Sequence, residues 1–483
     1  MNGGRAGAPR PAGTVAAVDL GATSGRVVLG RVGPDALEAT TVARFPNTPL
    51  FAGDGLHWDL LGLYGDVLAG LREAFRLEPE IASLGIDSWA VDYGLLRQGR
   101  LLGIPFHYRD ERTARGVAAV HERMPHAELF ARNGLQFLPF NTLYQLAAEP
   151  TEVLALADRA LLVPDLLAYW LTGEARAELT NASTTGLLDW SAQAWDDALI
   201  AGVGLPAGLR ELLPPLIAPG ERVGALLPAV ADSLGGAADV VAVGSHDTAS
   251  AVVAVPMRAD AAAYISCGTW GLVGVEVEHP VRTPEALAAN FTNEGGVDGR
   301  VRLLHNVMGL WILSETVRGW EREGHSVELP ALLAAAAEVP AGSVPVFDVD
   351  DPRFLPPGDM PARIGAWCAE HGLAAPRTRA EIARSIVESL AQAFADAAAT
   401  AARLGGLELR TIHLVGGGAQ NALLCQRTAD RAGVPVLAGP VEATALGNLL
   451  VQARTAGFVG GSLESLRDLV ARTHEPRRFA PQA

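Results

Sequence analysis

The sequence predicts a mixed α/β protein built from two large domains. A chain of 483 residues is too long for one ordinary core, so its length favours two domains. Apolar runs of strand length alternate with helical patterns, which is typical of α/β architecture. A strand, a glycine-containing turn and a second strand occur near residue 14 and again near residue 261, as in a weak internal duplication. We expect the ligand site in the cleft between the two domains.

The first half begins with a predicted hairpin. Residues 14–32 read TVAAVDLGATSGRVVLGRV, an apolar run, a turn of glycine and small hydroxyl residues, and a second apolar run. Residues 60–75 have a helical pattern, and further strand-like runs follow at 81–96, 160–164 and 239–245. These elements predict one complete α/β domain.

The second half repeats this beginning. Residues 261–277 predict another strand, glycine turn and strand, and residues 381–404 predict a long helix with apolar residues at helical spacing. Residues 411–439 read as a strand, a triple-glycine turn, a helix and a strand. The predicted organisation is a disordered lead at 1–13, an N-terminal domain at 14–254, a C-terminal domain at 255–455, and a helix with a frayed tail at 456–483.

Composition restricts the class of partner. Hydrophobic residues make up 49% and charged residues 19%, and no apolar stretch approaches the roughly 20 residues of a membrane span. A net charge of −16 disfavours nucleic acid, whose binding needs clustered cations. The first 13 residues lack the apolar region of a signal peptide. We expect a cytoplasmic protein with small-molecule partners and no membrane association; the choice between monomer and dimer stays open.

Cysteine and lysine usage excludes several chemistries. The three cysteines, Cys267, Cys368 and Cys425, are far apart and odd in number, which argues against a disulfide framework or a thiolate metal site. All 38 basic residues are Arg. Genomic composition explains the missing Lys better than selection does, but either way the chain has no Walker A loop, no protein-kinase strand lysine and no Schiff base. An ATP site here must use backbone amides, hydroxyls and a metal.

The first hairpin turn has the composition of a phosphate-binding loop. Gly21 and Gly25 allow a tight turn and close approach of backbone amides, and Thr23 and Ser24 add hydroxyl donors. Arg26 adds positive charge. Asp19, at the end of the strand, has the hard oxygen ligands that hold Mg²⁺ through water. An ordinary hairpin whose Asp and Gly serve the turn explains this segment equally well.

The segment GSHDTAS places an acid where a strand gives way to a helix. Asp247 lies at the positive end of that predicted helix, which keeps the carboxyl ionised. Such an Asp is more often a helix cap than a reactive group. A weak base is nevertheless adequate for phosphoryl transfer, because the transition state is loose. We take Asp247 as the candidate general base.

Two further segments offer weaker signals. The run VGGG at 415–418 begins like a dinucleotide fingerprint but lacks its third glycine. It provides a surface without side chains for an adenine or ribose, although a helix packed closely on a strand explains it as well. The acidic run DVDD at 348–351 resembles a metal site, but a loop turn is the better interpretation because no EF-hand spacing follows.

Taken together, the glycine-containing segments resemble the FGGY carbohydrate kinases, which share the two-domain ATPase fold of actin and hexokinase. The resemblance extends from residue 15 to about residue 450. It implies two ribonuclease H-like domains with a ligand cleft between them, and transfer of the ATP γ-phosphate to the 1-hydroxyl of a ketose with Mg²⁺. The segments that carry it are VDLGATSGRVVLGR, GIDSWAVDYGLL, YRDERT, NGLQFLPFNTLYQL, TNASTTGLLDW, SHDTASAVVA, SCGTWGLVG, NEGGVDGRVRLLHNVMGLW, DDPRFLPP, HLVGGGAQN and GPVEATALGN.

The resemblance also implies roles for particular residues. The family's first ATP loop falls on Ala22, Thr23, Ser24, Gly25 and Arg26. Its sugar-binding and catalytic triplet falls on His246, Asp247 and Thr248, with Asp247 as the base. Its second phosphate loop places Thr269 on ATP, its sugar-binding Asn is Asn306, and its adenosine-side glycine is Gly417.

Two positions depart from the family pattern. Ala90 replaces a glycine that contacts the sugar, so a methyl group intrudes and a different ketose becomes a candidate substrate. Ser314 replaces a nucleotide-binding Gln, so the direct contact with ATP is lost and water takes its place. Carboxylates and aromatic rings suited to hydroxyl recognition provide further candidates for the sugar pocket, although a structural role is more common for each. These candidates are Asp87, Trp89, Asp92, His107, Arg109 and Asp110.

The expected mechanism has ATP on the second domain and the sugar on the first, with closure of the cleft excluding water. Three alternatives remain. They are a related ketose or deoxysugar kinase, a sugar-sensing regulator that keeps the fold without catalysis, and a nicotinamide dehydrogenase built on VGGG. A coupled ADP assay across a panel of sugars tests the first. A regulator would normally carry a basic helix-turn-helix arm, which the 14 residues before the first strand are too few to form. A titration with NAD tests the third.

Overall fold

The computed structural model describes residues 12–206, 208–340 and 342–482, which form two compact units. The first unit contains the chain up to Pro256, then Glu294–Val301 and Ala443–Glu475. The second contains Met257–Asn293, Arg302–Glu442 and the chain from Pro476. Most of the expected lead at 1–13 lies outside the described residues, and Gly13 already belongs to a strand. Residues 443–455, which the sequence assigned to the second domain, pack within the first unit.

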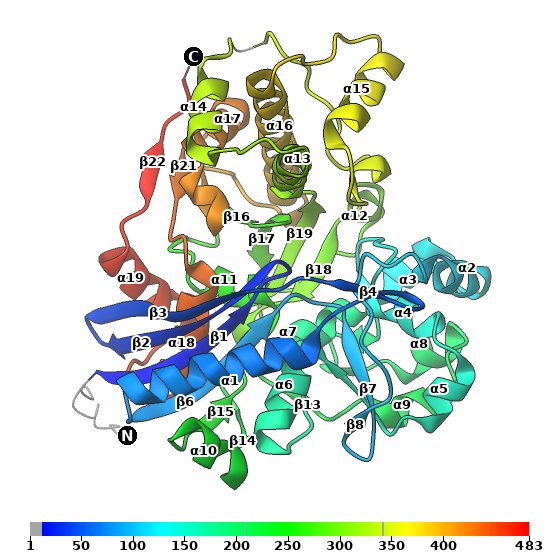
Figure 1. The fold of residues 1–483 in the computed structure, drawn as a ribbon, viewed down its shortest axis with the longest axis vertical. Helices are drawn as coiled ribbons and strands as arrows, with labels where there is room; N and C mark the ends of the chain where they lie inside the picture. The colour runs from blue at the N-terminus through cyan, green and yellow to red at the C-terminus, as the bar shows by residue number, and fades with distance from the viewer. Residues whose placement is uncertain (1–11, 207, 341, 483) are drawn as a thin grey trace. The chain divides into compact units, whose positions relative to one another are not determined.

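The first unit is built on a six-stranded sheet with the order β14-β15-β6-β1-β2-β3 (Figure 1). The predicted hairpin is confirmed, because β1 (Gly13–Leu20) pairs antiparallel with β2 (Ser24–Gly33). β3 (Ala36–Pro46) extends it antiparallel, while β6 (Ile81–Ser88) and β15 (Asp239–Val241) add parallel strands on the other side. β14 (Arg222–Ala225) completes the sheet.

Two helices cover opposite faces of this sheet. A Cβ on Gly70 of α1 (Leu60–Leu77) would meet the side chain of Val27, and a Cβ on Gly30 would meet Leu449 of α18 (Ala443–Ala456). Val27 and Gly30 are three residues apart on β2, so they face opposite sides of the sheet. The glycines let both helices pack closely on the strands that carry the candidate site.

The second unit repeats the same strand arrangement. Its seven-stranded sheet has the order β18-β19-β17-β16-β20-β21-β22. β16 (Ala262–Cys267) and β17 (Gly271–Val277) form the antiparallel hairpin, and β20 (Thr411–Val415) and β21 (Val436–Ala438) follow in parallel. The predicted two-domain α/β fold and the predicted duplication are therefore confirmed. The remaining strands are β18 (Thr292–Gly295), β19 (Val301–Val307) and β22 (Arg477–Phe479).

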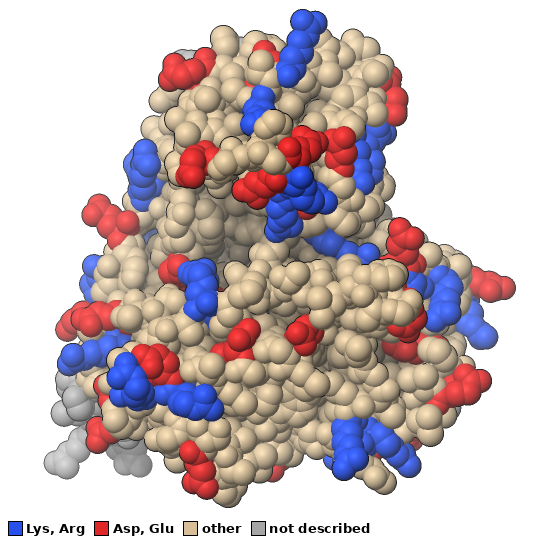
Figure 2. Space-filling model, in the orientation of Figure 1, with Lys and Arg blue, Asp and Glu red and all other residues tan. Residues whose placement is uncertain are grey.

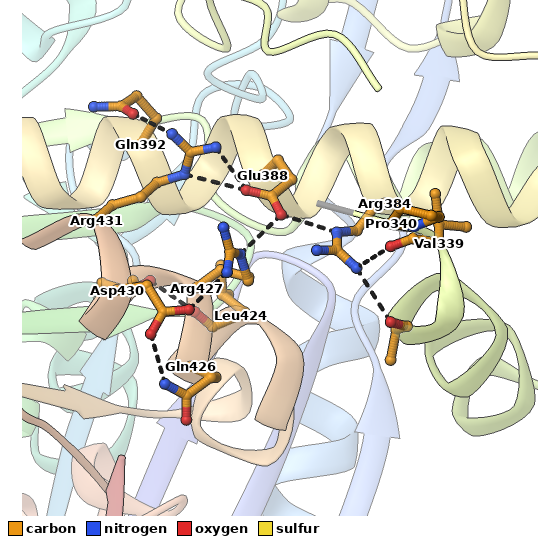
Figure 3. A network of polar contacts seen from close by, with 12 residues as sticks. Val339, Pro340, Arg384, Glu388, Gln392, Leu424, Gln426, Arg427, Asp430 and Arg431 are labelled. Carbon is orange, nitrogen blue, oxygen red and sulfur yellow. Dashed lines mark hydrogen bonds and ion pairs between the residues drawn. The ribbon is translucent and has the colours of Figure 1, made fainter. Parts of the chain in front are cut away.

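A long helix packs against this second sheet. α16 (Arg379–Gly405) begins with a capping box between Thr378 and Glu381 and buries one face, including Phe394, whose ring lies where a side chain on Gly271 would be. The predicted helix at 381–404 is confirmed. Glu388 joins α16 to α17 (Ala422–Ala432) through Arg427 and Arg431 of α17, and it also pairs with Arg384 one turn away on α16 (Figure 3).

Smaller elements complete both units. In the first unit these are β4 (Leu50–Ala52), β5 (Gly55–His57), β7 (Tyr93–Arg97), β8 (Arg100–Leu101), α2 (Thr113–Arg123), α3 (His126–Asn133), α4 (Thr142–Ala147), α5 (Thr151–Leu156), β9 (Arg159–Leu162), α6 (Val163–Thr172), β10 (Ala177–Glu178), α7 (Leu179–Ala182), β11 (Leu188–Asp189), β12 (Ala194–Trp195), α8 (Asp197–Gly202), α9 (Leu209–Leu212), β13 (Leu216–Ile217), α10 (Pro228–Leu234), α11 (Asp247–Val253) and α19 (Leu463–Thr473). In the second unit they are α12 (Pro284–Ala288), α13 (Trp311–Arg322), α14 (Leu329–Glu338) and α15 (Met360–Glu370). The expected frayed tail instead contributes β22, because Phe479 buries its ring.

The surface and the cysteines agree with the composition. On the face shown in Figure 2, acidic and basic side chains of the described residues are interspersed. All three cysteines are buried and none forms a disulfide. Among the described residues, no helix combines the length and the hydropathy needed to cross a bilayer.

Candidate functional site

The candidate base lies at the junction between a strand and a short helix of the first unit. The segment after β15 reaches Ser245, whose amide and hydroxyl both donate to Glu178 Oε2, at 2.9 and 2.8 Å. Glu178 is buried and also accepts from the amide and hydroxyl of Thr180. α11 then begins at Asp247 with His246 at the N-cap position, and no side chain caps it. Asp247 is therefore not the helix cap, and its carboxylate is available for other chemistry.

The surroundings of Asp247 suit a weak base. Its side chain keeps 31% of its surface exposed, and His246 Nε2 lies 3.4 Å from Oδ1. The hydroxyl of Thr248 donates to the same oxygen at 3.1 Å. Burial raises the pKa of Asp247, the charge of Asp19 raises it further, and His246 and Thr248 lower it. A partly exposed carboxylate with a raised pKa can accept a proton from a hydroxyl within hydrogen-bond reach.

Two more carboxylates and one arginine lie on the neighbouring strands. Asp19 of β1 is in register with Asp87 of β6 on one side and with Arg26 of β2 on the other. Arg26 Nε and Nη2 donate to Asp19 Oδ2 at 2.8 and 2.5 Å. The guanidinium predicted to face the nucleotide thus pairs with Asp19 across the hairpin.

Asp87 is the most enclosed of these acids. It is fully buried, Asn448 Nδ2 donates to its Oδ2 at 2.6 Å, and its Oδ1 has no hydrogen-bond partner among the described residues. Burial raises its pKa well above the ordinary value, and the charges of Asp19 and Asp247 add to the rise. Asp19, Asp87 and Asp247 thus lie close enough for their charges to interact, and Arg26 is the arginine that bonds to Asp19.

The predicted first ATP loop forms the turn between β1 and β2. Asn47, itself buried, fixes this turn by donating from its amide to Thr23 O and from Nδ2 to Gly21 O. Ala22 and Ser24 are half-buried and Thr23 is exposed. Gly25 is buried beneath the ring of Phe45, and a side chain at this position would collide with that ring. The exposed turn, rather than Gly25, is the part accessible to a ligand.

The predicted sugar side of the first unit is organised by Asp92. Its buried Oδ2 accepts from Trp58 Nε1 at 2.6 Å, from Trp89 Nε1 at 3.1 Å and from the Tyr108 amide at 3.1 Å. Gln145 Nε2 donates to Oδ1 at 2.8 Å. Burial raises the pKa of Asp92 to about 6 against the lowering effect of these donors. Asp92 therefore fixes two indole rings and one backbone segment together.

The aromatic rings held by Asp92 pack on one another. The ring centroids of Trp58 and Trp89 lie 4.1 Å apart, as do those of Trp58 and His107. His107 Nδ1 accepts from the Arg109 amide, and burial lowers its pKa to about 3, so the imidazole is neutral. Asp110 instead closes a turn by accepting from the amides of Leu56 and Arg112.

Ala90 lies in the loop that leaves this aromatic group. It is half-buried, and its carbonyl accepts from the Asp92 amide. The next residue, Val91, has φ of 69°, a strained conformation for a β-branched residue, and Thr142 Oγ1 donates to its carbonyl at 2.7 Å. Strain of this kind is found at ligand sites, where the surrounding structure enforces it.

In the second unit, Thr269 lies in the turn between β16 and β17. Gly309, with φ of 58°, approaches this turn so closely that a Cβ would lie 2.6 Å from Thr269 O. The amide of Trp311 donates to the same oxygen at 3.1 Å. Ser314 is exposed on α13, which begins at Trp311. The turn that carries Thr269 is thus locked onto the start of α13.

The three glycines of VGGG differ in backbone conformation and in the space around them. Gly416 has φ of 80°, and a side chain on Gly418 would collide with Cys267 Sγ. Gly417 is exposed, and a Cβ added to it would come no closer than 4.0 Å to its nearest neighbour, the carbonyl oxygen of Cys267. Two of the glycines therefore serve packing, and Gly417 alone offers a bare surface to a ligand.

Asn306 lies half-buried on β19, beside the acidic run at 348–351. Asp350 accepts from His305 Nε2 at 3.1 Å and from the Met308 amide at 3.1 Å. Asp348 accepts from the Asp350 amide, as in a loop turn. The turn interpretation is confirmed, and within the described ranges no group of three His, Cys, Asp or Glu side chains is arranged to hold a metal ion.

Three residues at the site had no role in the sequence predictions: Glu178, Glu294 and Asn448. Glu178 anchors the segment before Asp247, Glu294 lies 3.2 Å from His246, and Asn448 binds Asp87. The partners are 67, 48 and 361 residues away in the chain. Only tertiary structure brings them together, so no local pattern identified them.

The chain belongs to the FGGY family of carbohydrate kinases. Residues 15–254 match the N-terminal domain of this family and residues 263–456 match its C-terminal domain. The protein is therefore a sugar phosphotransferase, and the family implies ATP as its second substrate.

Individual relatives are similar to the chain over nearly its whole length. The chain is 42% identical over 477 residues to the rhamnulokinase of Pectobacterium carotovorum subsp. carotovorum (strain PC1), covering 97% of this chain and 93% of that one. It is 43% identical over 472 residues to the rhamnulokinase of Klebsiella pneumoniae (strain 342), covering 96% and 94%.

Solved structures show the same fold at lower identity. A ligand-bound xylulose kinase from Lactobacillus acidophilus has a TM-score of 0.78 at 17% identity, with 97% of this chain and 94% of that chain covered. Plasmodium falciparum glycerol kinase with ADP has a TM-score of 0.75 at 14% identity, with 97% and 94% covered.

Proposed function

We propose that this chain transfers the γ-phosphate of ATP to the 1-hydroxyl of L-rhamnulose, giving L-rhamnulose 1-phosphate, with Asp247 as the general base. The sequence identity of 41–43% to rhamnulokinases over nearly the whole chain is the reason for proposing L-rhamnulose as the acceptor. The position of Asp247 at the start of α11 supports its role, because the positive helix end favours the ionised carboxylate. This reaction suits a cytoplasmic enzyme of L-rhamnose catabolism.

The proposed binding residues follow from the same family pattern. The family pattern assigns the contacts with the sugar to Ala90, His246, Asp247, Thr248 and Asn306. ATP would be bound by the exposed turn at 22–24 with Gly25 and Arg26 beside it, and by Thr269 and Gly417. Ser314 is exposed on α13, which is consistent with contact through water.

The carboxylates of the first unit suit Mg²⁺ bound through water rather than directly, since no three His, Cys, Asp or Glu side chains of the described residues are arranged as a set of ligands. Asp19 would hold it through water, because hard oxygen ligands suit this ion. The excess of negative charge among Asp19, Asp87 and Asp247 fits a nearby cation, as does Oδ1 of Asp87, which has no partner among the described residues. Bound Mg²⁺ would supply neutralisation of the phosphate charge. The chain itself orients the hydroxyl and accepts its proton at Asp247.

A coupled assay of ADP release across a panel of ketoses tests this function. The panel contains L-rhamnulose, L-fuculose and L-xylulose, and the phosphorylated carbon is identified by ³¹P–¹H correlation spectra. We expect the highest kcat/KM with L-rhamnulose and phosphate on carbon 1. A clear preference for another sugar would establish the related ketose or deoxysugar kinase instead. Sugar binding without any ADP release would establish the sugar-sensing protein.

A further inference from the structure

The imidazole of His246 lies between two carboxylates of the first unit. Its Nε2 is 3.4 Å from Asp247 Oδ1, and its Nδ1 is 3.2 Å from Oε2 of Glu294, a residue of β18. The side chains of His246 and Glu294 are each 8% exposed, so water screens their contact only weakly. Glu294, His246 and Asp247 thus form a continuous line of side-chain contacts that ends at the proposed base.

The backbone beside Glu294 is held rigidly. The amide of Gly295 donates to Ser183 Oγ at 2.7 Å, and a Cβ on Gly295 would lie 2.3 Å from the ring of Trp190. Ser183 in turn donates to Thr180 O. The hydroxyl of Thr180 also binds Glu178, which anchors the segment before His246. Glu294 and His246 are therefore fixed by the same group of contacts, as the orientation of an imidazole requires.

We infer that Glu294 is a positioning residue of the phosphoryl-transfer reaction, which fixes a proton on Nδ1 of His246 and holds Nε2 toward Asp247. This inference rests on the proposed function. The contact is an ion-pair distance of 3.2 Å rather than a hydrogen bond, so it is the negative charge of an ionised Glu294 that favours a hydrogen on the ring nitrogen facing it. Nε2 is then the atom left to face Asp247 and the sugar hydroxyl. The contact with His246 lowers the pKa of Asp247, so the orientation of this ring also affects the proposed base.

A double-mutant cycle distinguishes positioning from a purely structural role. Glu294→Gln removes the charge and keeps the size, and His246→Gln removes Nδ1 while placing an amide near the position of Nε2. We expect Glu294→Gln alone to lower kcat about tenfold with the KM for ATP unchanged, and to lower it less than about twofold in the His246→Gln background. Equal losses in both backgrounds, or no loss in the single variant, would overturn the inference.

Asp298→Asn is the matched control. Asp298 lies four residues after Glu294 and pairs with Arg454 at the surface, with 35% of its side chain exposed. Its positive φ of 60° is tolerated by Asn. We expect wild-type kcat and KM from this variant. All variants are compared on whichever sugar the wild-type protein phosphorylates best.

The proton position is also measured directly. In ¹⁵N-histidine spectra of the full chain, with the His246 resonances assigned from His246→Gln, we expect a protonated Nδ1 in the wild type and its loss in Glu294→Gln. A wild-type Nδ1 without a proton would overturn the inference even if the variants were inactive. Failure of the proposed function is a separate result, because it appears as a wild-type protein that releases no ADP with any ketose.

Discussion

Asn448 of α18 donates from Nδ2 to Oδ2 of Asp87 on β6, at 2.6 Å and across 361 residues of chain. Both residues are fully buried. Gln452, one turn further along α18, donates to Asn448 Oδ1 and to Ala16 O and accepts from the Ser83 hydroxyl. This line of amides fastens α18 to the two strands that carry Asp19 and Asp87. The arrangement of the site carboxylates Asp19 and Asp87 therefore depends on a helix that comes much later in the chain.

Removing the Asn448 amide should harm both stability and turnover. Asn448→Leu keeps the volume but leaves a buried carboxyl without its donor, which should cost about 1.5–3 kcal/mol in the free energy of unfolding. We also expect kcat to fall, because Asp87 lies beside Asp19 in register. Urea unfolding and steady-state kinetics measure the two effects. Arg454→Gln is the control, because it breaks a surface ion pair on the same helix and should change the free energy of unfolding by less than about 0.5 kcal/mol. Equal losses of stability in both variants would show that the buried hydrogen bond of Asn448 contributes no more than a surface ion pair.

The base itself is tested by Asp247→Asn. The amide is nearly the same size but cannot accept the hydroxyl proton, so kcat should fall by about 10³-fold. The KM for the sugar should stay within about threefold, because the amide still forms hydrogen bonds. Asp239→Asn, on β15 and at the surface, serves as the control and should behave as the wild type. An Asp247→Asn enzyme with unaltered kcat would remove Asp247 from the mechanism.

In the second unit, Glu388 should be the most sensitive ion-paired residue (Figure 3). Its side chain is 2% exposed and lies 2.6–2.9 Å from nitrogens of Arg384, Arg427 and Arg431. Glu388→Gln leaves these guanidinium groups without their shared counter-charge, which should cost about 3 kcal/mol. Thermal unfolding measures the loss. The exposed pair of Glu408 and Arg410 provides the control, since Glu408→Gln should be nearly neutral; similar effects of the two changes would contradict this account.

The contact of His305 with Asp350 should make stability depend on pH. Burial alone would lower the pKa of His305, but the hydrogen bond and charge of Asp350 outweigh it, and the pKa is raised. A raised histidine pKa contributes stability that is complete below the unfolded pKa of about 6.5 and disappears as the pH rises through the folded pKa. Asp350→Asn should therefore lower Tm more at pH 6 than at pH 9. A pH-independent difference between the two proteins would show that the ion pair contributes nothing.

Local patterns explain why much of the fold was predictable. The hairpins at 14–32 and 261–277 and the helix at 381–404 each depend on residues close in sequence, such as the turn at Gly21 or the capping box at Thr378. The return of α18 to the first unit was not predictable in this way. It depends on buried amides that meet partners hundreds of residues away.

The same distinction applies to the site. Asp247 could be proposed from the sequence because a strand and a helix meet there, whereas Glu294 depends on a contact made 48 residues away in the chain. Arg26 is a different case, since it pairs with Asp19 in the structure, and its predicted role at the nucleotide stays a prediction. Residues 19 and 26 are equally distant from the centre of the hairpin turn, so strand register alone implied that they face each other.

Substrate preference should respond to Ala90. Its methyl group lies in the loop between Trp89 and the strained Val91, where the family pattern has glycine. Ala90→Gly should raise kcat/KM for L-rhamnulose relative to L-fuculose and L-xylulose by about tenfold. The reason is that one methyl group in contact with a substrate in a pocket is worth about 1–3 kcal/mol. The added backbone freedom should lower stability by about 0.5–1 kcal/mol. Ala192→Gly, in an exposed turn, separates the two effects, because it should lower Tm without changing the preference. Unchanged ratios of kcat/KM in Ala90→Gly would show that Ala90 does not contact the sugar.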